Sequence, residues 1–93
     1  MDKSENDSRG TLLTFPCDFT IKVFGKTSDE FEITVLQIIK KHVAYLAENA
    51  LQVRPSENGK YTAISITVHV DSKEQLDQIY KELSSSPQII MAL

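Results

Sequence analysis

The sequence predicts one α+β domain, a ferredoxin-like βαββαβ sandwich whose four-stranded antiparallel sheet carries two helices on one face. Apolar and polar residues alternate in two long segments, which is typical of strands with one buried face. In two other segments the apolar residues recur at helical spacing. The chain has only 93 residues, about the size of one domain. The order of these segments, β-α-β-β-α-β, is that of the ferredoxin-like arrangement.

The first strand is predicted over residues 18–24. Pro16 limits how early it can begin because proline has no N–H to donate to a sheet. Gly25 is expected to end it. The alternating residues expected to face the core are Phe19, Ile21 and Val23.

Residues 28–47 are predicted to form the first helix. Thr27 and Glu30 are read as a capping box at its start. Acidic residues in the first turn and basic residues near the end complement the helix macrodipole. The expected core-facing stripe is Phe31, Val35, Ile38, Ile39, Val43 and Leu46.

Residues 50–54 and 60–70 are predicted to form a hairpin. Pro55 ends the first of these strands, and Asn58-Gly59 supply residues that tolerate a positive φ in the turn. The longer strand alternates strictly between apolar and polar positions. A second helix is expected to begin near Ser72, because Ser72 with Gln75, or Asp71 with Glu74, fits a capping box.

Residues 89–93 are predicted to form the last strand. The folded domain therefore spans residues 12–93, and residues 1–11 are expected to be a flexible polar tail. Both crossovers should be right-handed, which places both helices on one face of the sheet. The other face is expected to stay open, and on the central strands it should show Lys22, Phe24, Ala63, Ser65, Thr67 and His69.

Two residues of this open face are candidates for contact with a protein partner or with a second copy of the chain. Phe24 places an aromatic ring on a face that should meet solvent, and exposed apolar surface tends to mark interfaces. It equally fits a scattered surface residue or one packed under a loop. His69 is either a half-exposed strand residue or an interface residue.

Composition argues against several functions. The net charge is −3 and the basic residues are scattered, whereas nucleic-acid binders usually carry a basic stripe. No apolar segment approaches the ~20 residues of a membrane span. The single cysteine and the absence of a signal peptide favour a cytoplasmic protein. No metal or cofactor site and no enzyme activity are predicted, because the sequence offers no ligand spacing, acid–base pair or activated nucleophile.

Several motifs together resemble the YbeD-like family of small bacterial cytosolic proteins. They are Phe15-Pro16…Phe19-Thr20…Lys22-Val23…Gly25, Val53-Arg54-Pro55-Ser56…Gly59-Lys60-Tyr61, Ser65-Ile66-Thr67 and Tyr80-Lys81-Glu82-Leu83. The resemblance covers residues 12–93 and implies a fold like the ACT regulatory domain, which binds amino acids in metabolic enzymes. The family has no established catalytic residues. Its genes are often found near lipoate-attachment genes, which implies a regulatory link to that process.

The likeness to ACT domains implies a ligand near the loop after the first strand, at Gly25, Lys26 and Thr27. A glycine turn and a helix cap explain the same residues, so both interpretations stay open. Turn geometry does not require Arg54, Lys60 and Tyr61, which are therefore candidate partner contacts. The function expected is a regulatory module without catalytic activity that senses a small metabolite or modulates a metabolic partner. The alternative is a protein–protein interaction domain with no ligand.

Overall fold

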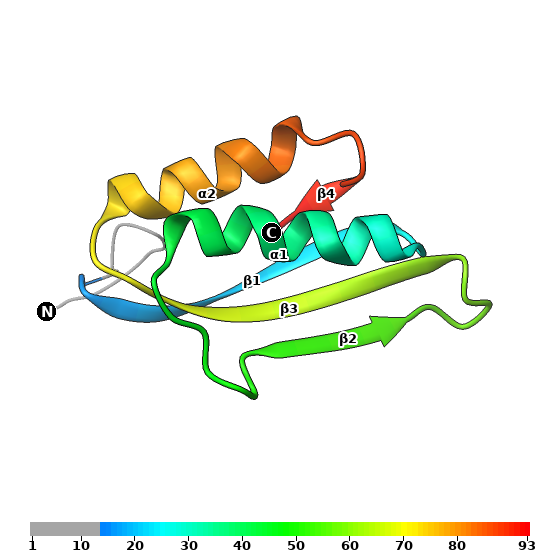
Figure 1. Cartoon of the computed structure of the whole chain (residues 1–93), viewed down its shortest axis with the longest axis horizontal. Helices are drawn as coiled ribbons and strands as arrows, with labels where there is room; N and C mark the ends of the chain where they lie inside the picture. The colour runs from blue at the N-terminus through cyan, green and yellow to red at the C-terminus, as the bar shows by residue number, and fades with distance from the viewer. Residues whose placement is uncertain (1–13) are drawn as a thin grey trace, which may run out of the picture.

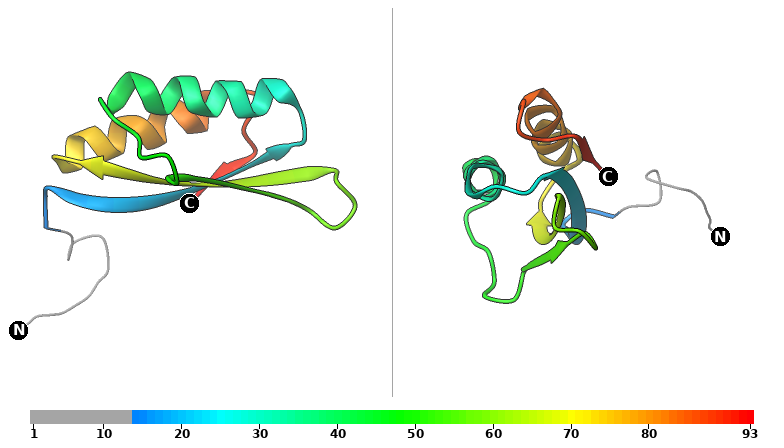
Figure 2. Two further views of the ribbon diagram at one scale, coloured as in Figure 1. Left: turned by 60° about the horizontal axis from the view of Figure 1, so that its bottom comes forward. Right: turned by 90° about the vertical axis from the view of Figure 1, so that its right-hand side faces the viewer.

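The computed structural model describes residues 14–93, and the predicted tail over residues 1–11 lies outside them. Its elements are β1 (Cys17–Lys26), α1 (Asp29–His42), β2 (Leu51–Pro55), β3 (Tyr61–Val70), α2 (Lys73–Ser85) and β4 (Met91–Ala92). The four strands form one antiparallel sheet in the order β2-β3-β1-β4. Both helices lie on the same face of this sheet (Figures 1 and 2), so the predicted fold class is confirmed.

The core lies between the sheet and the two helices. In β3 buried and more exposed residues alternate along the whole strand, because every second residue from Thr62 to Val70 is buried. The residues that form the core are Ile21, Val23, Phe31, Val35, Ile38, Ile39, Val43, Ile64, Ile66, Val68, Val70, Leu76, Ile79, Leu83 and Ile89. The side chains on the inward face of each long strand therefore pack in the core, whereas those on the outward face are available for binding.

Helix α1 ends earlier than the sequence pattern predicts. Its last residue is His42, and Val43 already has extended dihedral angles (φ −127°, ψ 140°). The end predicted at residue 47 is wrong because Val43 is buried outside the helix, so the apolar pattern continues past the last turn. At the other end the N-cap is Ser28, not Thr27: the Ser28 Oγ accepts a hydrogen bond from the N–H of Phe31 at 3.0 Å.

Gly25 lies inside β1 and does not end it. A Cβ atom at this position would lie 2.5 Å from two carbons of the Phe31 ring and 2.7 Å from the backbone oxygen of Gln88. Only glycine leaves room for α1 to bring its first buried ring this close to the strand. The strand therefore continues to Lys26, which pairs with Tyr61.

The hairpin between β2 and β3 closes where the sequence predicts it. Gly59 has φ 75°, and its N–H donates to the backbone oxygen of Ser56 at 2.9 Å. The Asn58 side-chain oxygen accepts from the N–H of Lys60 at 3.0 Å. This turn sets the register in which Arg54 lies opposite Ala63.

Strand β4 is shorter than the predicted segment 89–93. Only Met91 and Ala92 form ladder pairs with β1. Further backbone hydrogen bonds extend the pairing on both sides. The N–H of Ile90 donates to the Phe24 carbonyl at 2.8 Å, and Leu93 and Lys22 exchange two hydrogen bonds, of 2.7 and 3.0 Å.

Glu82 of α2 links the two helices outside the core. Its Oε1 lies 2.8 Å from Nε2 of His42, and its Oε2 accepts a hydrogen bond from Lys41. The hydrogen bond from Lys41, followed by that from His42, lowers the pKa of Glu82 from its ordinary value of 4.5. The Gln75 side-chain amide also donates to the His42 carbonyl at 2.6 Å.

This link predicts a specific pH dependence of stability. A carboxylate whose pKa is lowered by folding stabilises the folded state above its unfolded pKa, and this contribution is lost as the pH falls through the folded value. The unfolding free energy of the wild type should therefore decrease more between about pH 6 and pH 3 than that of Glu82→Gln. Urea titrations over this range measure the difference, with Glu57→Gln in the exposed hairpin turn as the control. Equal slopes for the wild type and Glu82→Gln would contradict the assignment.

Candidate functional site

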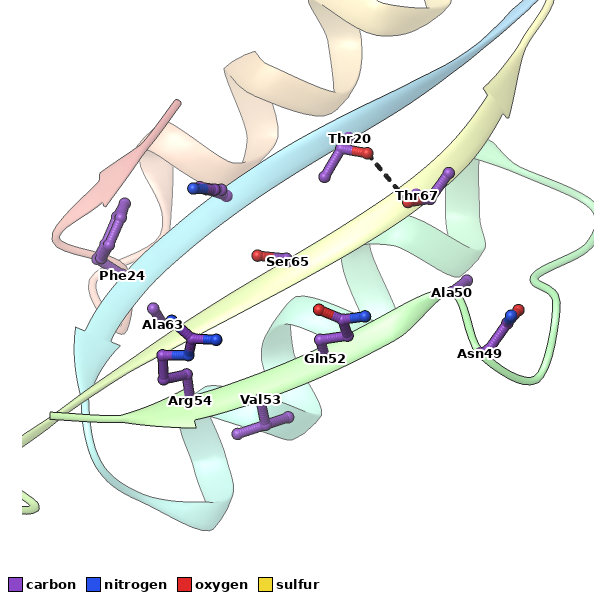
Figure 3. Close-up of a pocket in the computed structure, with 11 residues that line it drawn as sticks. Thr20, Phe24, Asn49, Ala50, Gln52, Val53, Arg54, Ala63, Ser65 and Thr67 are labelled. Atoms are coloured by element: carbon purple, nitrogen blue, oxygen red, sulfur yellow. Dashed lines mark hydrogen bonds between the residues drawn. The ribbon is translucent and has the colours of Figure 1, made fainter.

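The uncovered face of the sheet carries a shallow groove of about 640 Å³, formed by β1, β3 and β2 with the two residues before β2. The hollow lies over β3 because Ala63 and Ser65 of this strand have small side chains. The residues that line it are Thr20, Lys22, Phe24, Asn49, Ala50, Gln52, Val53, Arg54, Ala63, Ser65 and Thr67, drawn as sticks in Figure 3. We call this hollow the open-face groove.

Strand register places the outward side chains of the groove in rows across the sheet. The first row runs Arg54, Ala63, Phe24, Met91. The next runs Gln52, Ser65, Lys22. Thr20 and Thr67 follow, and their hydroxyl oxygens are 3.0 Å apart (Figure 3). The sequence prediction that Lys22, Ala63, Ser65 and Thr67 share the open face is confirmed by this pairing.

Two cationic side chains line the open-face groove, and no carboxylate is among the residues that line it. Lys22 comes from β1 and Arg54 from β2, so that β3 with Ala63 and Ser65 lies between them. The whole chain has a net charge of −3, so the groove differs in sign from the molecule as a whole. Its side chains are best suited to a ligand that offers negative charge or hydrogen-bond acceptors.

The opposite end of the same face is acidic. Nδ1 of His69 lies 3.0 Å from Oδ1 of Asp18, and its Nε2 lies 3.8 Å from Oδ1 of Asp71. All three side chains are exposed. With Tyr45, two of them line a second hollow of about 390 Å³. His69, a predicted partner contact, is thus at the far end of the sheet from Phe24.

Three of the predicted partner contacts come together. Phe24, Arg54 and Tyr61 line a third hollow of about 210 Å³, at the hairpin end of the open face. Lys60 lies in the adjoining turn, where its backbone oxygen accepts a hydrogen bond from the N–H of Thr27.

The predicted ligand residues Gly25, Lys26 and Thr27 line none of the three hollows described above. Gly25 is packed against Phe31. The Thr27 hydroxyl lies 2.8 Å from that of Thr62, and both Lys26 and Thr27 are exposed. The glycine turn and the helix cap that the sequence offered for these residues are both wrong, because Gly25 lies inside β1 and Ser28 caps α1. Packing against Phe31 accounts for Gly25, and the contact with Thr62 accounts for Thr27.

Sequence reasoning missed the contribution of β2 and the residues before it. Asn49, Ala50 and Gln52 line the groove, but the open-face residues named from the sequence all lie on the central strands. Counting back from the Asn58-Gly59 turn would have placed Gln52 opposite Ser65, because a tight turn fixes hairpin register. That signal was present in the sequence.

Residues 14–93 hold no group of three or more His, Cys, Asp or Glu side chains placed to bind a metal ion. They also hold no helix that is both long enough and apolar enough to cross a membrane.

Residues 10–93 match a family model described as "Protein of unknown function (DUF493)". The chain belongs to the DUF493 family. One similar protein, described as a UPF0250 protein of Paraburkholderia phymatum, is 37% identical over 83 residues, which cover 89% of this chain and 93% of the relative. A UPF0250 protein of Janthinobacterium sp. is 38% identical over 86 residues, covering 92% and 94%. The predicted resemblance to the YbeD-like family is confirmed by these matches.

Solved structures show that this DUF493 chain has an ACT-like fold. The solution structure of HP0495 from H. pylori matches with a TM-score of 0.70 at 17% identity, covering 94% of this chain and 91% of that one. The ACT domain from GTP pyrophosphokinase of Chlorobium tepidum matches with a TM-score of 0.61 at 11% identity, covering 82% and 84%. At such low identities the likeness concerns the fold alone.

Proposed function

We propose that this protein is a regulatory module without catalytic activity, which binds a small metabolite in the open-face groove and thereby modulates a metabolic partner. The groove itself is the observation that carries the proposal. It lies on the face that the helices leave free, and three strands supply its polar groups. The ACT-like fold supports the regulatory part, since one structural neighbour is an ACT domain.

The residues of the open-face groove are suited to holding a ligand. Lys22 and Arg54 donate hydrogen bonds to negative groups, and the side chains of Gln52 and Asn49 can both donate and accept. No His, Cys, Asp or Glu is among the lining residues, so they include no acid–base pair for proton transfer and no thiol nucleophile. This composition favours recognition.

Regulation through this groove would work by differential binding. A ligand that contacts β1, β2 and β3 together favours the conformation in which the three strands keep their observed register. A partner that binds the same conformation would then be favoured by the same free energy, because coupling between two sites is reciprocal.

The proposal predicts a ligand-dependent rise in thermal stability that requires an empty groove. The panel contains amino acids and, because of the implied link to lipoate attachment, lipoate-type acids. A true ligand at 100 times its Kd should stabilise the wild type by about 2.7 kcal/mol. Ser65→Leu, which fills the groove at its centre, should abolish the shift measured by thermal denaturation.

Gln78→Leu, which places the same leucine side chain on the exposed face of α2, is the control and should keep the shift. The proposal fails if no compound in the panel stabilises the wild type. It also fails if Ser65→Leu and Gln78→Leu respond alike.

A protein-interaction domain with no metabolite is the second candidate, and exposed apolar side chains favour it. Tyr61 is 44% exposed and Met91 is 47% exposed. Met91 lies directly opposite Phe24, so apolar surface gathers at the hairpin end of the open face. A homodimer through Phe24 belongs to this candidate, and sedimentation of the wild type at increasing concentration tests it.

A further inference from the structure

We infer that the free edge of β2 binds an extended, acidic segment of a partner protein as a fifth strand of the sheet. This site differs from the metabolite site proposed above because its main contacts are backbone groups at the edge of the sheet, although the two sites share Gln52 and Arg54. In the strand order β2-β3-β1-β4, β2 pairs on one side only among the described residues. Figures 1 and 2 show its other side facing away from the rest of the molecule.

Two hydrogen bonds show which peptide groups of β2 point outward. The N–H of Thr67 donates to the Ala50 oxygen at 2.9 Å, and the N–H of Ser56 donates to the Tyr61 oxygen at 2.7 Å. In an antiparallel pair such bonds recur at every second residue. The even-numbered residues of β2 therefore bond to β3, while the N–H and C=O groups of Leu51 and Val53 face outward.

This edge lacks most of the features that block strand addition. Its register with β3 runs without a bulge from Leu51 to Pro55. Natural edges are often protected by bulges, prolines or charges that point inward. Here Pro55 lies at the very end of the strand, and Arg54 points to the open face. The edge is thus open over Leu51–Arg54.

The side chains along the edge define the partner. An added strand would place alternate side chains beside Gln52 and Arg54 on the open face, and the others beside Leu51 and Val53. Val53 is 42% exposed, so an apolar neighbour would cover it. Arg54 lines two hollows, neither of which includes a carboxylate. The matching segment alternates glutamate with a β-branched residue.

The charge of this surface favours a different protein as the strand that pairs with β2, and not a second copy of this chain. Two copies paired antiparallel through β2 and centred on Val53 would place each Arg54 beside Gln52 of the other copy. They would also bring the cationic grooves of both copies together without supplying a carboxylate. An acidic segment supplies the missing charge.

The test uses the full chain labelled with ¹⁵N and three short peptides. The first alternates glutamate with valine, the second has lysine for glutamate, and the third is the first with N-methylated backbone. The glutamate peptide should slow amide hydrogen exchange at Leu51 and Val53. The N-methylated peptide keeps the side chains but cannot form ladder bonds, so it should give no protection.

Charge reversal identifies the recognising side chain. Arg54→Glu should bind the glutamate peptide about fivefold more weakly, the effect of one exposed charge pair, and should gain affinity for the lysine peptide. Lys60→Glu, the same charge reversal in the turn, should change the affinity for neither peptide strongly. Ser65→Leu should leave peptide binding intact even if metabolite binding is lost.

Three results would overturn the inference. The glutamate peptide could slow amide hydrogen exchange in β1 and not in β2. Arg54→Glu could keep the wild type's preference for the glutamate peptide, or the chain could self-associate through β2 in the absence of peptide.

Discussion

Replacing Phe31 with alanine should lower the free energy of unfolding by about 3–5 kcal/mol. The ring is fully buried at the start of α1 and lies against Gly25 of β1. Its backbone N–H, which donates to Ser28 Oγ, is kept in the variant, so the loss reports packing alone. Because a domain's whole stability is about 5–15 kcal/mol, this loss is a large share of the total.

Urea unfolding followed by circular dichroism measures this loss. Ile33→Ala is the matched control, because Ile33 is on the same helix but 54% exposed. Its cost should stay within about 0.5 kcal/mol, as for other surface substitutions. If the two variants lost stability equally, Phe31 would not hold α1 against the sheet.

Gly25→Ala is expected to destabilise the protein by about 1–3 kcal/mol, although it adds only one methyl group. That methyl would overlap both the Phe31 ring and the backbone oxygen of Gln88. The ring can turn, but the carbonyl belongs to the connection between α2 and β4, whose next residue, Ile89, is packed in the core. Relief therefore requires a shift of the backbone.

A double-mutant cycle with Phe31→Leu separates the two contacts. The cost of Gly25→Ala should be smaller in the Phe31→Leu background, since a smaller side chain removes part of the overlap. The same variant tests the ligand interpretation of Gly25. If Gly25→Ala kept full stability and lost its response to metabolites, the loop after β1 would be the binding site.

The fold could be predicted because its signals are local. Alternation in β1 and β3 and helical spacing in α1 and α2 each depend on neighbouring residues only. The end of α1 could not be predicted in this way. Val43 is buried, and Leu46 packs partly against the core, so the apolar pattern continues where the helix has stopped. Tertiary contacts decide whether a buried residue lies in a helix or in extended backbone.

The candidate site could be predicted only in part. Period-two alternation places Lys22, Phe24 and Ser65 on the open face. The groove also needs Gln52 and Arg54 of β2, and their position depends on hairpin register. The hollow itself arises where small side chains of the central strand lie between longer ones on both neighbours. That relation between three strands is not visible in any single segment.

The pairing of β1 with β3 has a consequence for folding kinetics. All ten pairs from Cys17–Val70 to Lys26–Tyr61 join residues that lie far apart along the chain, with α1 and β2 between them. Forming such contacts requires a long loop to close, which slows folding relative to helical proteins of equal size. Lys22 and Ser65 meet only after this step. A ligand that needs both therefore does not bind the isolated hairpin, and its binding free energy adds in full to the stability of the folded chain.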